Sequence, residues 1–278
     1  MNIQRIAAFT YESRGGNPAG VVIAEQMPDD GTMLKIAQKV GYSETAFLKR
    51  EKEGWRIRFF APEMEVPFCG HATIASGAAL GKQFGLGAYK LYLNEGDISI
   101  DVSQSDNGVL TTTLQSPRTW SKIASQVLIA KLFTIFNFSA DDVANNFPIR
   151  IAAAGATHLI VVLNSRQVLA DMSYDYKQLK MLMSECSLVT INLLWRESMQ
   201  LFHSRNPFPP GGVYEDPATG AAAAAFAGYL RDIDYDCNNH LTILQGHDMG
   251  LPSRLLVEFT NSVGEGVYVT GETRFIDY

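Results

Sequence analysis

Two short stretches combine reactive side chains with glycine at the start of small-residue runs. CGHAT contains Cys69 and His71, and DPATG contains Asp216. Each leads into an Ala-rich segment typical of a helix, and a helix N-terminus exposes unpaired N–H groups and carries partial positive charge. Glycine also lets a ligand approach the backbone closely. We therefore expect two helix starts that face each other and form a pocket for a carboxylate or phosphate group.

A third reactive residue, Glu44, lies in the strand-like run SETAF and is followed by apolar residues. In a strand of period two, Glu44 shares a face with Ala46. A carboxylate that faces an apolar interior loses hydration, which disfavours its charged form, and a proton carrier at neutral pH needs this property. The sequence thus makes Glu44 a candidate acid/base, with an exposed strand glutamate as the alternative.

The other candidates also have structural interpretations. Asp216 before Pro217 is a typical N-cap with proline at the first helical position. His71 could be a hydrogen-bonded core histidine. Cys69 follows apolar residues, so it could be a small buried hydrophobe, although a helix N-terminus favours a thiolate.

Composition excludes several classes of function. The 278 residues are 46% hydrophobic and 19% charged, as expected for one large or two medium globular domains. The net charge of −6 and the lack of a Lys/Arg cluster argue against nucleic-acid binding. No apolar run approaches the roughly 20 residues of a membrane helix, and the N-terminus lacks the pattern of a signal peptide. We expect a cytoplasmic protein with a small-molecule substrate.

Cofactor motifs are missing as well. The three cysteines and five histidines show no CxxC or HExxH spacing, so we expect no metal. The sequence has neither GxGxxG nor a Walker loop, and we expect no nucleotide cofactor.

The elements that would position the candidates occur twice in the same order. The pattern of turns, alternation and helical periodicity predicts strand, loop, strand, helix, strands and then a helix of small residues in both halves. In the first half these are strands at 3–11 and 21–24, a helix at 28–41, strands at 43–51 and 54–62, a helix at 70–85 and hairpins at 90–117. In the second they are a short helix at 139–148, strands at 149–164, a helix at 175–187, a strand at 188–195, a helix from 218, and final strands at 241–246, 254–260 and 266–272.

The two small-residue helices can be aligned. Ala72–Leu80 lies over Ala218–Phe226 with an offset of 218 − 72 = 146 residues. Side chains this small allow a curved sheet to wrap closely around the helix, and alanine is the best helix former. The repeat favours a duplicated α+β domain. We expect one domain at 1–118, to which the last strand (about 267–278) can return, and a second at 119–266.

With these stretches identified, the chain resembles the PhzF-like (phenazine biosynthesis) family of isomerases, which shares its fold with diaminopimelate epimerase. The resemblance implies two pseudo-symmetric half-barrel domains, each a curved, mostly antiparallel sheet around a central helix, with the active site between them. It also implies a homodimer and proton transfer without a cofactor. It rests on GNPAGVV (16–22), SETAF (43–47), FCGHAT (68–73), GATHLIV (155–161), EDPATGAA (215–222) and QGHDMGLPS (245–253).

Residue roles follow from the same resemblance. It implies that Glu44 carries the proton between carbons of a small carboxylated metabolite, and that His71 and Asp216 assist and orient the substrate. It further implies a set of substrate-binding positions: Asn17, Ser43, Gly70, Gly220 and Ala221.

The sequence departs from the family pattern at two positions. The family usually has serine where this chain has Ala221, and often arginine where it has Leu251. Both changes reduce anchoring for a carboxylate, which leaves a non-catalytic small-molecule-binding or interaction protein as the alternative. A two-thiol epimerase is disfavoured, because the second helix begins without a cysteine and Cys237 follows that helix.

Overall fold

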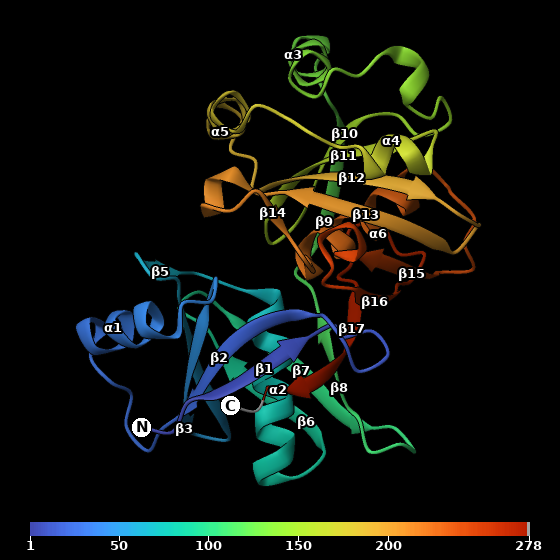
Figure 1. The fold of residues 1–278 in the computed structure, drawn as a ribbon. Helices are drawn as coiled ribbons and strands as arrows, with labels where there is room; N and C mark the ends of the chain where they lie inside the picture. Colours follow the sequence, from blue (N-terminus) through green and yellow to red (C-terminus); the bar gives the residue numbers. More distant parts are fainter. Residues whose placement is uncertain (277–278) are drawn as a thin grey trace. The chain divides into compact units, whose positions relative to one another are not determined.

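A computed structural model describes residues 1–276 and divides the chain into two compact units (Figure 1). Unit 1 contains residues 1–115 together with the chain from Thr270 onward, and unit 2 is Ser116–Val269. The final strand of the chain therefore belongs to the first unit.

Eight strands of unit 1 pair in a closed ring. The ring order is β17, β1, β2, β3, β4, β6, β7, β8 and back to β17. The pairs β2–β3 and β4–β6 are parallel, and the other registered pairs are antiparallel. The strands are β1 (Gln4–Ala8), β2 (Asn17–Ile23), β3 (Thr45–Glu51), β4 (Gly54–Phe60), β6 (Gly87–Tyr92), β7 (Asp97–Gln104), β8 (Leu110–Gln115) and β17 (Tyr268–Phe275).

Helix α2 (Gly70–Phe84) runs through this ring and contacts β1, β2, β3, β7 and β8. Its residues from His71 to Gly81 are all buried. A Cβ at Gly81 would lie 2.6 Å from Val102 Cγ1, so the ring has no space for a larger side chain. The small residues thus serve close packing between the helix and the surrounding strands.

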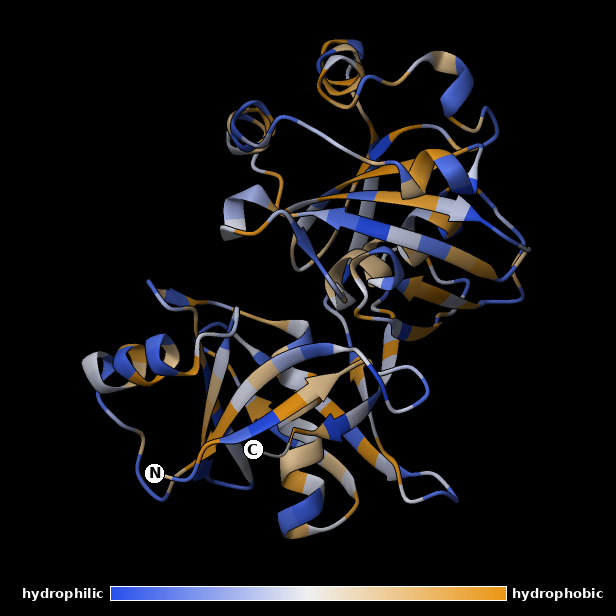
Figure 2. Ribbon diagram, viewed as in Figure 1, coloured by the Kyte–Doolittle hydropathy of each residue, from blue (hydrophilic) through white to orange (hydrophobic). Residues whose placement is uncertain are grey.

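Helix α1 (Asp30–Val40) packs against the outside of the ring. Asp29 caps its N-terminus by accepting from Thr32 N–H, and Gly41 ends it in the left-handed region at φ 72°. Met33 and Ala37 pack with Phe47 of β3. Figure 2 shows hydrophilic and hydrophobic residues side by side along α1, as expected for a helix with one covered face.

Unit 2 repeats the strand order of unit 1. Its order is β9, β10, β11, β12, β13, β15, β16, with β11–β12 and β13–β15 parallel, which matches β2–β3 and β4–β6. Helix α6 (Gly220–Asp232) takes the place of α2 and contacts β9, β10, β11 and β16. The strands are β9 (Thr119–Ile123), β10 (Arg150–Ala154), β11 (Thr157–Leu163), β12 (Thr190–Arg196), β13 (Leu201–Pro207), β15 (His240–Gln245) and β16 (Ser253–Glu258).

A short strand precedes each of the central helices α2 and α6, and the helix starts differ from the predicted alignment of the two halves. β5 (Glu65–Val66) pairs with β4, and β14 (Glu215–Asp216) pairs with β13. Cys69 and Thr219 are the N-cap residues of α2 and α6, so the helix starts are 219 − 69 = 150 residues apart. The sequence offset of 146 was wrong, because alanine repeats align equally well in several registers.

Three helices cover unit 2 from outside: α3 (Gln126–Phe136), α4 (Arg166–Ala170) and α5 (Tyr176–Glu185). The helix predicted at 139–148 is only a 3-10 turn, η1 (Ala140–Asp142), because the backbone is already extended at Val143 (φ −106°, ψ 137°). Two further 3-10 turns are η2 (Pro209–Gly211) and η3 (His247–Met249). Within residues 1–276, the helices are too short or too polar to cross a membrane.

Candidate active site

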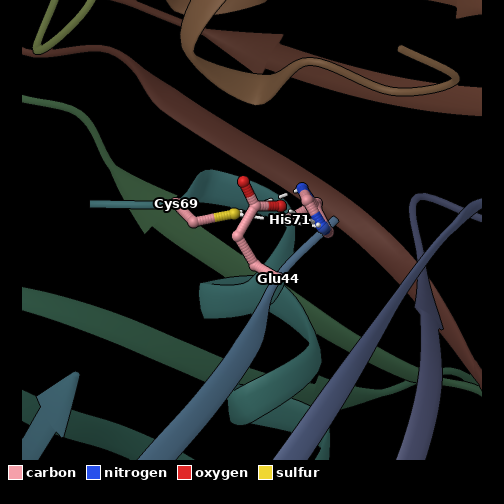
Figure 3. A group of neighbouring side chains, drawn as sticks. All are labelled: Glu44, Cys69 and His71. Atoms are coloured by element: carbon pink, nitrogen blue, oxygen red, sulfur yellow. Dashed lines mark hydrogen bonds and ion pairs between the residues drawn. The ribbon is translucent and has the colours of Figure 1, made fainter. Parts of the chain in front are cut away.

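Glu44, Cys69 and His71 meet in unit 1, where their side chains point toward one another (Figure 3). Glu44 Oε2 lies 3.3 Å from His71 Nε2, and Cys69 Sγ lies 3.3 Å from His71 Nδ1. Ser43 Oγ is also 3.3 Å from His71 Nε2. A carboxylate, a thiol and a hydroxyl thus each lie 3.3 Å from a ring nitrogen of His71.

Glu44 occupies the position directly before β3 rather than one within the strand. Its carbonyl oxygen accepts from Gly20 N–H at 3.2 Å, which extends the β2–β3 ladder by one bond. The prediction that Glu44 lies inside the strand was wrong, because regular pairing begins at Thr45. At this end of the strand the carboxylate reaches the start of α2 instead of the apolar interior of the ring.

His71 and Cys69 are held by the first turn of α2. Cys69 is the N-cap residue, and its side chain makes no capping hydrogen bond to the helix. Gly70 is the first helical residue, so its N–H belongs to the group that lacks an acceptor within the helix. The predicted binding position Gly70 thus offers a backbone donor beside the His71 ring.

Burial makes the Glu44 carboxylate unusual. Its side chain is 14% exposed, and that of His71 is 6% exposed. Glu44 Oε2 is buried and accepts no hydrogen bond from the described residues, although His71 Nε2 is near. Leaving a buried polar atom without a hydrogen bond is unfavourable by about 1–3 kcal/mol. Such an atom is suited to accept a proton or to contact a ligand.

Asn17 is the remaining predicted binding residue of unit 1. It is the first residue of β2, lies opposite Ala8 and is 2% exposed. Its place next to the positive-φ glycines Gly15 and Gly16 fits a turn that ends as the strand begins.

Asp216, Gly220 and Ala221 lie at the start of α6 in unit 2. Asp216 belongs to β14 opposite Asn206, and its Oδ2 accepts from Thr219 Oγ1 at 2.6 Å. The N-cap interpretation of Asp216 was wrong, because Thr219 is the N-cap and Gly220 begins the helix. Gly220 is buried and Ala221 is partly exposed.

Gln245 organises this helix start, a role that the sequence analysis did not assign. It is 2% exposed at the end of β15. Its amide nitrogen donates to the Asp216 carbonyl at 2.7 Å, and its amide oxygen accepts from Thr219 N–H at 3.1 Å. Gln245 therefore satisfies backbone groups before α6 and fixes the loop that carries Asp216.

The next residue, Gly246, lets two loops approach each other. It has φ 74°, and a Cβ there would lie 2.8 Å from Pro217 O and would overlap Leu251 O. Gly250 also has φ 74°, but a Cβ there meets no atom within 4 Å. The two glycines share a left-handed backbone conformation and differ in the space around them.

We predict that Gly246→Ala destabilises the protein by about 1–3 kcal/mol more than Gly250→Ala. Both variants place a side chain in the left-handed region, so their difference isolates the clash with the Pro217 and Leu251 carbonyls. Chemical denaturation of the two variants measures it. Equal loss of stability in both would contradict the close approach.

A buried polar network links three strands to α6. His158 Nδ1 contacts Thr190 Oγ1 at 2.8 Å, and Thr190 donates to Asn206 Oδ1 at 2.9 Å. The network continues to Asn192, which donates to the Ala222 carbonyl at 3.3 Å. Complete burial lowers the pKa of His158 from 6.5 to about 3. The ring is therefore neutral in the folded protein.

This pKa predicts a specific acid sensitivity. The unfolded chain binds a proton at His158 below pH 6.5, whereas the folded chain does so only near pH 3. Stability is therefore lost as the pH falls through this window, by about 2 kcal/mol between pH 7 and pH 5. His158→Gln should remove this component. The free energy of unfolding of the wild type should therefore exceed that of the variant by about 2 kcal/mol less at pH 5 than at pH 7. An equal difference at both pH values would contradict the low pKa of His158.

Comparison with known proteins identifies the family. The family PhzC-PhzF, described as "Phenazine biosynthesis-like protein", matches residues 6–276. An uncharacterized isomerase of Clostridium acetobutylicum is 30% identical, over 82% of this chain and 78% of its own. The trans-2,3-dihydro-3-hydroxyanthranilate isomerase of Pseudomonas aeruginosa is 29% identical, over 90% of this chain and 87% of its own.

Solved structures show the same fold. A PhzF-family phenazine biosynthesis protein of Bacillus anthracis has a TM-score of 0.88 at 22% identity, with 99% of this chain and 96% of the other covered. A probable proline racemase of Agrobacterium radiobacter has a TM-score of 0.66 at 11% identity, with 99% and 91% covered. The predicted epimerase-like α+β fold is confirmed. With the family match spanning nearly its whole length and isomerases among its relatives, this chain is an isomerase of the PhzC-PhzF family.

Proposed function

We propose that the protein moves a proton between two carbons of a small carboxylated metabolite, with Glu44 as the only acid/base and without a metal or coenzyme. This proposal rests on the burial of the Glu44 carboxylate. Its Oε2 atom lies near the His71 ring but accepts no hydrogen bond from the described residues. A buried acid with free accepting capacity is suited to general acid–base catalysis.

In the proposed reaction, Glu44 takes a proton from an activated carbon and becomes a neutral acid. The electron pair of the broken C–H bond moves into the conjugated frame of the substrate. Glu44 then returns the proton to another carbon and is again a carboxylate, so atoms and charge balance. The Gly70 backbone N–H, at the first position of α2, would stabilise the negative charge that develops.

His71 and Ser43 would orient the substrate beside Glu44, since Ser43 Oγ and Glu44 Oε2 each lie 3.3 Å from His71 Nε2. For Asp216, Gly220 and Ala221, a role in substrate binding stays a prediction from the family resemblance, as it does for Asn17. Homodimer formation likewise stays a prediction, and light scattering of the purified chain would test it.

The substrate named for the Pseudomonas relatives is the first compound to try. Ala221 and Leu251 replace polar residues of the family pattern, so this chain has fewer donors for a polar carboxylated ring. We therefore propose a substrate of the same chemical class with fewer hydrogen-bonding substituents, and a panel of cyclic, conjugated carboxylates should include both kinds.

The test is turnover in deuterium oxide, followed by mass spectrometry of the product. We expect no more than one deuterium, at the carbon that gains hydrogen, and full activity after dialysis against EDTA. Activity that disappears on dialysis and returns with an added metal ion would contradict the proposal.

A further inference from the structure

The cluster around His71 also has the composition of a zinc site. It contains a thiol, an imidazole and a carboxylate, and one ligand atom from each residue lies within 4.8 Å of the others. Cys69 is 8% and His71 5% exposed. Thiolate and imidazole ligands favour zinc over magnesium or calcium, and zinc sites in enzymes often have three protein ligands and one open position.

The distances fit one ion. Zinc binds sulfur at about 2.3 Å and nitrogen or oxygen at about 2.0–2.2 Å, so ligand atoms around a tetrahedral ion lie roughly 3.3–3.7 Å apart. His71 Nε2 lies 3.3 Å from Glu44 Oε2 and 3.9 Å from Cys69 Sγ. The Cys69 and Glu44 ligand atoms lie within 4.8 Å of each other, so rotation of these two side chains would bring the three atoms to tetrahedral spacing.

We propose that Cys69, His71 and Glu44 form a binding site for Zn²⁺, and that the bound ion switches the isomerase off. His71 Nε2 would bind the metal. The Cys69 sulfur lies closer to Nδ1 (3.3 Å) than to Nε2 (3.9 Å), so the Cys69 side chain would turn toward the ion on Nε2.

Charge and hydrogen bonding support this site. A thiolate and a carboxylate together neutralise the two charges of the ion, which a buried site requires. The buried Glu44 Oε2, which accepts no hydrogen bond from the described residues, would gain a partner. Binding releases the thiol proton of Cys69 to solvent and involves no oxidation or reduction.

The inhibition rests on the proposed function, whereas the metal binding does not. A metal ion on Glu44 Oε2 occupies the lone pair that would accept the substrate proton. Glu44 could therefore hold either the metal ion or the proton taken from the substrate, but not both. A chelator that removes the ion should restore activity.

Cobalt is the probe for the site, because Co²⁺ replaces Zn²⁺ and gives a visible spectrum. We expect the full-length chain, without a histidine tag, to bind one Co²⁺ with tetrahedral bands and a thiolate-to-cobalt charge-transfer band, and Zn²⁺ to displace it. Cys69→Ser should remove the charge-transfer band. Its affinity loss should exceed the roughly 10- to 100-fold that removal of an outer partner causes.

Cys186→Ser is the matched control, because Cys186 is a partly exposed thiol of unit 2. It should leave the spectrum unchanged. No tetrahedral spectrum in the wild type, or an unchanged charge-transfer band in Cys69→Ser, would overturn the proposal.

Activity separates this proposal from the proposed function. We expect stoichiometric Zn²⁺ to inhibit turnover and EDTA to restore it. If Co²⁺ binds through Cys69 but Glu44→Gln keeps full activity, the metal site stands and the proposed catalytic role of Glu44 fails. If Glu44→Gln is inactive and no metal binds, the proposed catalytic role of Glu44 stands and the metal site fails.

Discussion

Replacing Glu44 with glutamine should lower the isomerase rate by about 100- to 10,000-fold, the usual contribution of a general acid/base. Glutamine has nearly the same shape and can still accept a contact from His71, but it cannot take up a proton from carbon. The loss should appear in kcat, because the proposed substrate contacts of Ser43 and the start of α2 would be unchanged. The turnover number with the best substrate of the panel measures it.

Glu51→Gln is the control for this variant. Glu51 ends the same strand, β3, and its side chain is 36% exposed in a surface ion pair with Lys49. We expect its activity to equal that of the wild type. Unchanged turnover in Glu44→Gln, with the protein folded as judged by circular dichroism, would end the assignment of Glu44 as the proton carrier.

Arg205→Met should destabilise the protein by about 3–5 kcal/mol, because it leaves a buried carboxylate without its partner. Arg205 Nε donates to Glu215 Oε2 at 2.9 Å, and both residues are 8% exposed. Arg205 also donates to the Ala170 carbonyl at 2.8 Å. Glu215 precedes Asp216, so the pair anchors the strand that carries a predicted substrate-binding residue. Chemical denaturation measures the loss.

The double variant Arg205→Met/Glu215→Leu should recover much of this stability, since no unpaired charge remains buried. Unit 1 offers a comparison in Arg58, which pairs with Glu65 before α2. Their side chains are 17% and 26% exposed, so water can solvate the remaining charge and Arg58→Met should lose less. A double variant as unstable as Arg205→Met would contradict this explanation.

Local sequence signals were sufficient to predict some of the helices that begin and end at capping residues of their own. Helix α1 shows this best, because Asp29 and Gly41 cap it as the sequence suggests. The small residues of α2 and α6 likewise indicated helices inside a curved sheet, since only such packing explains so many buried alanines and glycines. Glu44 and His71 each lie in a short distinctive stretch, SETAF and CGHAT, and their catalytic roles stay predictions.

Contacts between distant segments could not be read from spacing. Gln245 is one of several polar strand residues in the sequence, and only the fold shows that it holds the loop before α6. We also did not anticipate helix α3, although Ser125 caps its start and Asn137 ends it in the left-handed region. Its sequence QVLIAKLFTIF is apolar on most sides, so it lacks the periodic pattern that marks a surface helix.

The position of β17 in the chain has a consequence for biosynthesis. This strand pairs with β1 and β8, yet it follows all of unit 2 in the sequence. During translation, the first unit therefore emerges from the ribosome with two unpaired strand edges, which stay open until the last segment has been made. Unpaired edges are sites of aggregation, so the first unit is exposed to this risk until β17 has been made, whereas unit 2 has all its strands by residue 269.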